Sequence, residues 1–179
     1  QNNKKYAIEA VKSNYMALTS LVRKFKKDRD IVMAAVRVNG SALGWVHKSF
    51  YKDKDILREA VKTDSFSFHY APKDLKNNKE FVLEILKLNG ECLYSVSKNL
   101  QKDKQVVLTA VKSNGNALIY ANKNFLKDKE VVLKAVLSDP DALDYADDSL
   151  QKDPEILNAA NKKKVFHWHY TDKPLRKTP

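Results

Sequence analysis

The amino-acid sequence predicts an all-α solenoid of about six to seven 25-residue repeats, each with two helices. Asp or Asn recurs at one position of every repeat, and apolar side chains keep a fixed spacing after it through six units without an insertion. One such unit cannot bury its own apolar face, whereas stacked units can. The predicted array covers residues 1–164, with repeats at about 1–25, 26–50, 51–75, 76–100, 101–125 and 126–150 and a partial repeat at 151–164.

The first helix of each unit is predicted from its cap and its apolar face. An Asp or Asn side chain at the start of a helix accepts a hydrogen bond from an unpaired backbone N–H. In the fourth unit, five apolar residues from Phe81 to Leu86 form a broad face that suits packing on two sides. The predicted caps are Asn3, Asp28, Asp53, Asn78, Asp103, Asp128 and Asp153.

These first helices are expected to end where Gly or Asn can adopt a left-handed conformation. The pairs Asn39-Gly40, Asn89-Gly90 and Asn114-Gly115 fit that expectation. In the sixth unit Asp139-Pro140 stands at the same place and is another stop signal.

The second helix of each unit is predicted to be short, with about two turns that are partly 3₁₀. Ala117, Leu118 and Ala121 give it one buried face, and Pro72 lies where the helix of the third unit must end. The competing fold is a leucine-rich repeat, which needs apolar residues two apart along a strand. Polar residues at Ser13, Thr63, Ser113 and Ser138 break that alternation and favour helices.

Residues 165–179 are predicted as a C-terminal tail or capping segment. Within it, aromatic side chains at 166, 168 and 170 alternate with Val165, His167 and His169. We expect this segment to cover the open apolar end of the last unit or to lead into a following domain. The two histidines lack the further ligands that a metal site needs, so no metal is predicted.

The segment DKQVVLTAVKSNGNALIYANKNFLKDKEVVLKAVLSDPDALDYA, from Asp103 to Ala146, resembles the helical repeat family catalogued as domain of unknown function 4116. The resemblance covers nearly the whole chain up to about Lys164. It is weakest in the first unit, which has Asn3 in place of Asp and Tyr15 in place of Gly. The resemblance implies a helical-repeat fold and brings no catalytic residue, cofactor or accepted activity.

Composition narrows the function classes. No apolar run approaches the length of a membrane span, no signal peptide is visible, and the chain begins with Gln, which we take to indicate a piece of a larger protein. One cysteine, Cys92, is compatible with a reducing compartment but leaves the localisation unknown. The common nucleotide, hydrolase and metalloprotease motifs are absent. We therefore expect no enzyme activity and no cofactor.

The net charge is +11, and only five of the 33 basic residues are Arg. Cations next to the predicted N-caps oppose the helix dipole, and they are either solvated, offset by neighbouring acids, or part of an anion-binding ridge. The sixth unit is acidic, and Asp148 replaces the cation that other units have at that position. The residues of this lysine ridge are Lys27, Arg29, Lys52, Lys54, Lys79, Lys102, Lys104, Lys127 and Lys129.

Aromatic residues also recur at one position of the repeat. This aromatic column consists of Trp45, Tyr70, Tyr120 and Tyr145. Such rings either pack between neighbouring units, with polar atoms at the edge, or provide anchors for an extended peptide.

We predict a non-catalytic interaction module that binds a protein or peptide on one face. The alternative from another class is an electrostatic binder of nucleic acid or anionic membrane through the lysine ridge, although the low Arg content weighs against base reading. A third hypothesis is that the chain is a targeting or spacer segment of a larger protein.

Overall fold

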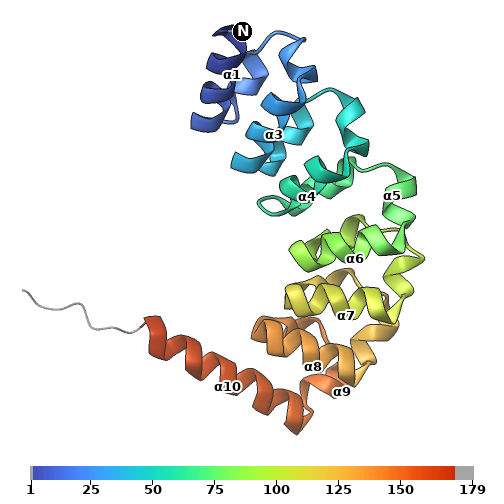
Figure 1. The fold of residues 1–179 in the computed structure, drawn as a ribbon. Helices are drawn as coiled ribbons and strands as arrows, with labels where there is room; N and C mark the ends of the chain where they lie inside the picture. The colour runs from blue at the N-terminus through green and yellow to red at the C-terminus, as the bar shows by residue number, and fades with distance from the viewer. Residues whose placement is uncertain (1, 172–179) are drawn as a thin grey trace, which may run out of the picture.

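A computed structural model describes the backbone of residues 2–171 and the side chains of residues 3–162. Residues 2–171 contain α-helices and 3₁₀ helices, and no strand occurs among them. Figure 1 shows the repeats stacked in chain order into a curved array, with α1 at one end and α10 at the other. The predicted all-α repeat architecture is confirmed.

The first element of each repeat is an α-helix that packs against the first helix of the next repeat. The side chain of Asp28 accepts hydrogen bonds from the backbone N–H groups of Asp30 and Ile31, as expected of an N-cap. Asn3 differs from the prediction, because it lies inside the first helix. These helices are α1 (Asn2–Ser13), α3 (Arg29–Val38), α4 (Lys54–Val61), α6 (Lys79–Leu88), α7 (Lys104–Ser113), α8 (Lys129–Ser138) and α10 (Pro154–Thr171).

The second element is a 3₁₀ helix of six residues, which gives the two turns expected from the sequence. In repeat three it ends at Tyr70, two residues before Pro72. The 3₁₀ helices are η2 (Gly40–Trp45), η4 (Ser65–Tyr70), η5 (Gly90–Ser95), η7 (Gly115–Tyr120) and η9 (Pro140–Tyr145), and repeat one has the short α2 (Ala17–Ser20) in this place.

A third short helical segment, which the repeat pattern does not predict, joins each 3₁₀ helix to the next first helix. Backbone hydrogen bonds connect these parts of neighbouring repeats: the N–H of Asn122 donates to the carbonyl of Gln101 at 3.2 Å. The segments are η1 (Phe25–Lys27), η3 (Lys48–Lys52), α5 (Lys73–Asn77), η6 (Leu100–Lys102), η8 (Lys123–Lys127) and α9 (Asp148–Gln151).

The predicted left-handed caps are wrong. Asn89 has an extended backbone, with φ of −156°, and its side chain caps η5 by accepting from the N–H of Glu91. No glycine within residues 2–171 has a positive φ. Glycine is instead required by the close approach of two repeats, because a Cβ on Gly90 would lie 2.2 Å from the carbonyl oxygen of Ala110. Gly40 and Gly115 meet the carbonyls of Ala60 and Ala135 in the same way.

The junction between repeats three and four departs from this pattern. Phe81 and Ile85 are buried there, and Ile85 replaces the Ala that other repeats have at that position. The Phe81 ring lies against α4, where Lys54 Nζ and the guanidinium of Arg58 are 5.1 and 5.4 Å from its centre. α4 and α6 pack less closely than other neighbouring first helices do. Ser65 occupies the position of the close-approach glycines at this junction, consistent with the wider spacing.

The C-terminal end is formed by α10, which packs against α8 and continues as one helix to Thr171. The backbone at positions 165–171 is therefore helical. The predicted covering of the last repeat by side chains of positions 165–170 lies outside the described residues, as do residues 172–179.

Candidate interaction surfaces

The N-termini of the first helices are linked by ion pairs between successive repeats. Lys104 Nζ lies 2.8 Å from the carboxylate of Asp128, which is the N-cap of the next first helix, and 2.9 Å from Glu130. The same arrangement joins Lys4 to Asp28, Arg29 to Asp53, Lys79 to Asp103 and Lys129 to Asp153. We call this set the ion-pair ladder.

The ladder explains cations at a place where the helix dipole disfavours them. Each cation faces a carboxylate of the following repeat, which offsets the dipole of its own helix. The hydrogen bond from Lys79 lowers the pKa of the Asp103 carboxyl below its ordinary value. Burial raises the pKa of the Asp53 carboxyl, but hydrogen bonds from Arg29 and from backbone N–H groups outweigh it and leave the pKa lowered.

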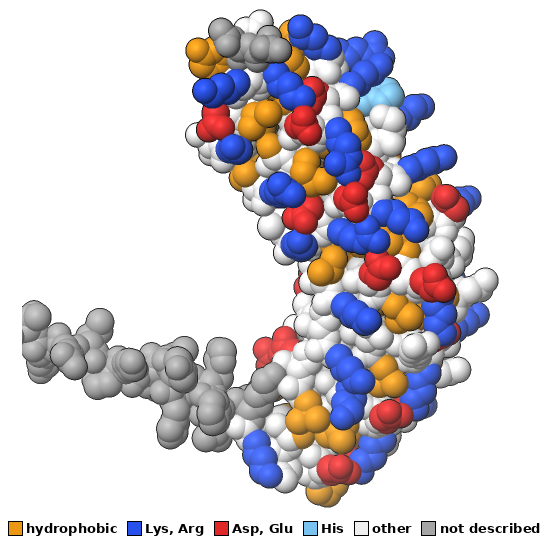
Figure 2. Space-filling view, in the orientation of Figure 1, with side chains coloured by type: hydrophobic (Ala, Val, Ile, Leu, Met, Phe, Trp, Pro, Cys, Tyr) orange, Lys and Arg blue, Asp and Glu red, His pale blue; other side chains and the backbone are white. Residues whose placement is uncertain are grey.

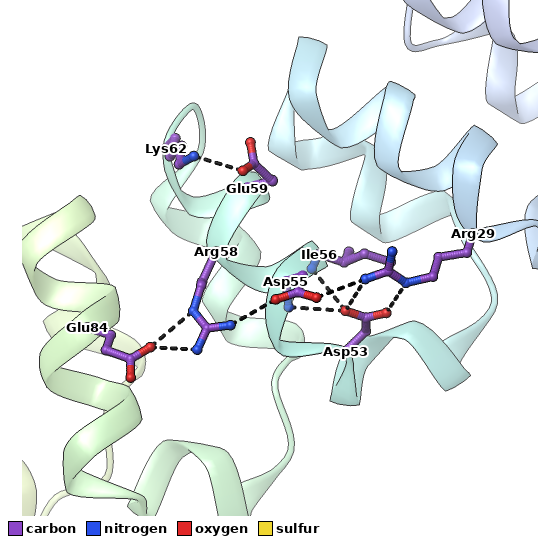
Figure 3. Close-up of polar contacts among 8 residues, drawn as sticks. All are labelled: Arg29, Asp53, Asp55, Ile56, Arg58, Glu59, Lys62 and Glu84. Atoms are coloured by element: carbon purple, nitrogen blue, oxygen red, sulfur yellow. Dashed lines mark hydrogen bonds and ion pairs between the residues drawn. The ribbon is translucent and has the colours of Figure 1, made fainter.

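Between repeats three and four the ion pair at the N-cap is replaced by a different one, because Asn78 stands in place of the usual Asp. Lys54 finds no N-cap carboxylate there, and its Nζ lies 5.1 Å from the centre of the Phe81 ring. Figure 3 shows the alternative link, in which Arg58 reaches from Asp55 in its own helix to Glu84 in the next repeat. Its Nη2 lies 2.7 Å from Glu84.

The lysine ridge is therefore divided between paired and unpaired cations. Arg29, Lys79, Lys104 and Lys129 belong to the ladder, and Lys127 lies 3.4 Å from Asp147. Figure 2 shows Lys and Arg side chains along the whole arc, with Asp and Glu side chains between them. Lys27, Lys52 and Lys102 form no ion pair with the residues whose side chains are described.

The aromatic column lies on the 3₁₀ helices, and its members have different surroundings. Trp45 exposes half of its surface. Tyr70 lies over Gly44, where a Cβ would come within 2.6 Å of the tyrosine hydroxyl. Tyr120 contacts the ring of Tyr94 at 5.6 Å between centroids. In repeat four the column is interrupted by Ser95, which is buried.

Two aromatic residues outside the column connect its members across that interruption. The centre of the Phe66 ring lies 6.2 Å from the centre of the Tyr70 ring and 6.1 Å from that of Tyr94. The Tyr94 ring in turn contacts the Tyr120 ring. Phe66, Tyr70, Tyr94 and Tyr120 thus form an aromatic strip across η4, η5 and η7. Phe66 is 51% exposed and Tyr120 is 39% exposed, so part of the strip faces solvent. Sequence reasoning missed Phe66 and Tyr94 because neither repeats at one register.

The strip ends in a groove between repeats four and five, with a volume of about 420 Å³. Its apolar lining includes Tyr94, Ile119, Tyr120 and Leu126, and Ile119 is 52% exposed. Its charged lining consists of Lys98, Lys102 and Lys123, and no acidic side chain of the described residues 3–162 lines it. The groove therefore combines exposed apolar surface with positive charge.

The surroundings of the single cysteine and of the possible metal ligands indicate structural roles. Cys92 is fully buried, and burial raises the pKa of its thiol, which keeps it protonated. Among the residues described, no three His, Cys, Asp or Glu side chains are grouped so that they could hold a metal ion. No helix in the described part of the chain is long and apolar enough to cross a membrane.

The fold and its stacked surfaces define an α-helical repeat protein. The family model described as Domain of unknown function (DUF4116) matches residues 3–51, 53–101, 78–126, 103–151 and 128–176. Each match begins at a predicted N-cap position and spans two successive 25-residue repeats. The chain belongs to this family. No curated protein and no solved structure matches the chain.

Proposed function

We propose that the chain is a non-catalytic interaction module that binds a protein or peptide segment along its 3₁₀ helices. The observation that carries the proposal is the aromatic strip, which continues across three repeats and is partly exposed. Aromatic side chains are frequent centres of binding energy, because they bury a large area with few rotatable bonds.

The proposal includes the absence of enzymatic activity. Cys92, the single cysteine, is buried with a raised thiol pKa, which suits packing better than nucleophilic attack. The 3₁₀ helices and the groove beside them expose aromatic rings and lysines, which suit the recognition of a protein or peptide.

The second candidate function is electrostatic binding of nucleic acid or anionic membrane through the lysine ridge. The net charge of +11 favours it. The ion-pair ladder weighs against it, because Arg29, Lys79, Lys104 and Lys129 already bind carboxylates of the next repeat. A spacer role, in which the chain has no ligand of its own, is the third candidate.

A random-peptide display selection against the immobilised chain tests the proposal. Peptides that are enriched are then titrated in solution by fluorescence anisotropy, at salt concentrations from about 50 to 200 mM. We expect binding that survives this range and weakens by about tenfold or more in Tyr120→Ala and in Phe66→Ala. Leu88→Ala is the matched control, because Leu88 is an exposed apolar residue at the end of α6.

Three results would reject or reorder these candidates. Enriched peptides that bind equally to Tyr120→Ala, Phe66→Ala and Leu88→Ala would remove the strip as the binding surface. Strong binding of RNA, DNA or anionic vesicles with a steep salt slope would put the electrostatic function first. A Lys52→Glu/Lys102→Glu variant should then flatten that slope. No enrichment and no anion binding would favour the spacer.

A further inference from the structure

We infer that the groove between repeats four and five binds an acidic peptide segment, with one apolar side chain of that segment seated in the groove. The inference rests on the proposed function and specifies its ligand. The groove volume of about 420 Å³ lies within the range of ligand sites, about 300–1,000 Å³. It is thus large enough for a bulky apolar side chain.

The apolar contact comes from two 3₁₀ helices of neighbouring repeats. The rings of Tyr94 in η5 and Tyr120 in η7 are in contact, with 5.6 Å between their centres, and the neighbouring Ile119 is 52% exposed. An apolar side chain placed against these residues would remove exposed hydrocarbon from water on both partners. This burial would supply affinity that does not depend on salt.

The charge of the groove selects an acidic partner. Lys98, Lys102 and Lys123 line it, without a carboxylate among the lining residues to neutralise them. Neither Lys102 nor Lys123 forms an ion pair with a described residue, so both can meet carboxylates of a ligand. The groove thereby differs from the ladder, where the protein supplies its own carboxylates.

Part of the lining is held in place before any ligand binds. Gln101 is buried, and its Nε2 donates to the carbonyls of Leu93 at 2.8 Å and Val96 at 3.1 Å. Its Oε1 accepts from Lys98 Nζ at 3.1 Å. Such fixed positions reduce the entropy that binding would otherwise cost.

The neighbouring junctions lack this combination. One repeat later, Asp144, Asp147 and Asp148 stand where the groove has Ile119, Asn122 and Lys123, so an acidic segment would be repelled. One repeat earlier, Ser95 stands in place of Tyr120. This combination of exposed apolar surface and lysines therefore distinguishes the groove from the two junctions next to it.

The test uses a fluorescein-labelled peptide, Glu-Asp-Glu-Leu-Phe-Asp-Glu-Asp, and a second peptide with Ala-Ala in place of Leu-Phe. The full chain is compared with two charge-matched variants, Lys102→Glu/Lys123→Glu in the groove and Lys112→Glu/Lys134→Glu on exposed parts of α7 and α8. We expect the groove variant to lose about tenfold in affinity, and the control variant less than about twofold. The Ala-Ala peptide should also bind about tenfold more weakly. Circular dichroism verifies that each variant is folded.

Any of four results would overturn the inference. Equal losses in the two double variants would reduce the effect to net charge, and equal affinity for the two peptides would remove the apolar seat. Failure of the acidic peptide to bind, while display-selected peptides still bind through Tyr120, would overturn the inference and leave the proposed function standing. If no peptide binds in a Tyr120-dependent manner, both fail.

Discussion

Replacing Gly90 by Ala tests how closely neighbouring repeats pack. The added Cβ would lie 2.2 Å from the carbonyl oxygen of Ala110 and 2.9 Å from the backbone nitrogen of Asn114. Both atoms belong to the backbone of the next repeat, so no side-chain rotation can relieve the contact. An ordinary contact begins at 3.4 Å, so repeat five would have to retreat by about 1.2 Å, the difference from 2.2 Å.

We expect Gly90→Ala to lower the free energy of unfolding by about 1–3 kcal/mol, the usual cost of overpacking a well-packed core. The backbone of Gly90 has no positive φ, so conformational strain at the substituted residue adds nothing. If instead glycine were present for a left-handed cap, Asn would be tolerated. Gly90→Asn therefore separates the two explanations, and we expect it to cost at least as much as Ala.

Urea titration followed by circular dichroism measures these changes. Gly44→Ala is the control, because its Cβ would meet only the hydroxyl end of Tyr70, which can move. We expect Gly44→Ala to change the free energy of unfolding by less than about 1 kcal/mol. A stable Gly90→Asn protein, or equal losses for Gly90→Ala and Gly44→Ala, would refute the close-approach explanation.

Three further predictions concern caps, pH and the thiol. Asp103→Ala should lower the free energy of unfolding by about 1 kcal/mol in urea titration, because it removes the acceptor for the N–H of Val106, whereas Asp103→Asn keeps the cap and should cost less. Equal costs would show that the cap bond adds nothing. The folded state lowers the pKa of the Asp103 and Asp153 carboxyls, so unfolded chains take up protons first as the pH falls. Stability should therefore be full above about pH 5 and decline as the pH falls through 4 and below, and thermal melts that rise on acidification would contradict this. Cys92 should react with a thiol reagent at the rate of unfolding rather than of the free thiol, and fast reaction in native buffer would contradict its burial.

Much of the fold follows from the sequence because the physics of a repeat is the same in each unit. The N-cap at Asp128 and the buried pair Val131 and Val132 need only local hydrogen bonding and a helical face, and both features recur from one repeat to the next. The short third segments were not predicted, since they carry no long apolar face and are fixed by hydrogen bonds to neighbouring repeats.

The interaction surface was harder to predict because it depends on contacts between different columns. Tyr94 contacts the ring of Tyr120, whereas the residue at its own repeat position in the next unit is Ile119. Phe66 and Tyr94 each occur once at their own position in the repeat, so a search for columns overlooks them. The ion-pair ladder could be predicted from a pattern in the sequence. A cation directly follows one N-cap, and acids stand at the next N-cap and shortly after it, as in Lys104, Asp128 and Glu130.

Hydrogen exchange of the chain with and without a display-selected peptide tests the central claim most directly. If the 3₁₀ helices form the binding surface, the peptide should slow exchange in residues 65–70, 90–95 and 115–120, and leave α3 and α8 unchanged. Slower exchange confined to the first helices, with none in these three segments, would contradict the account.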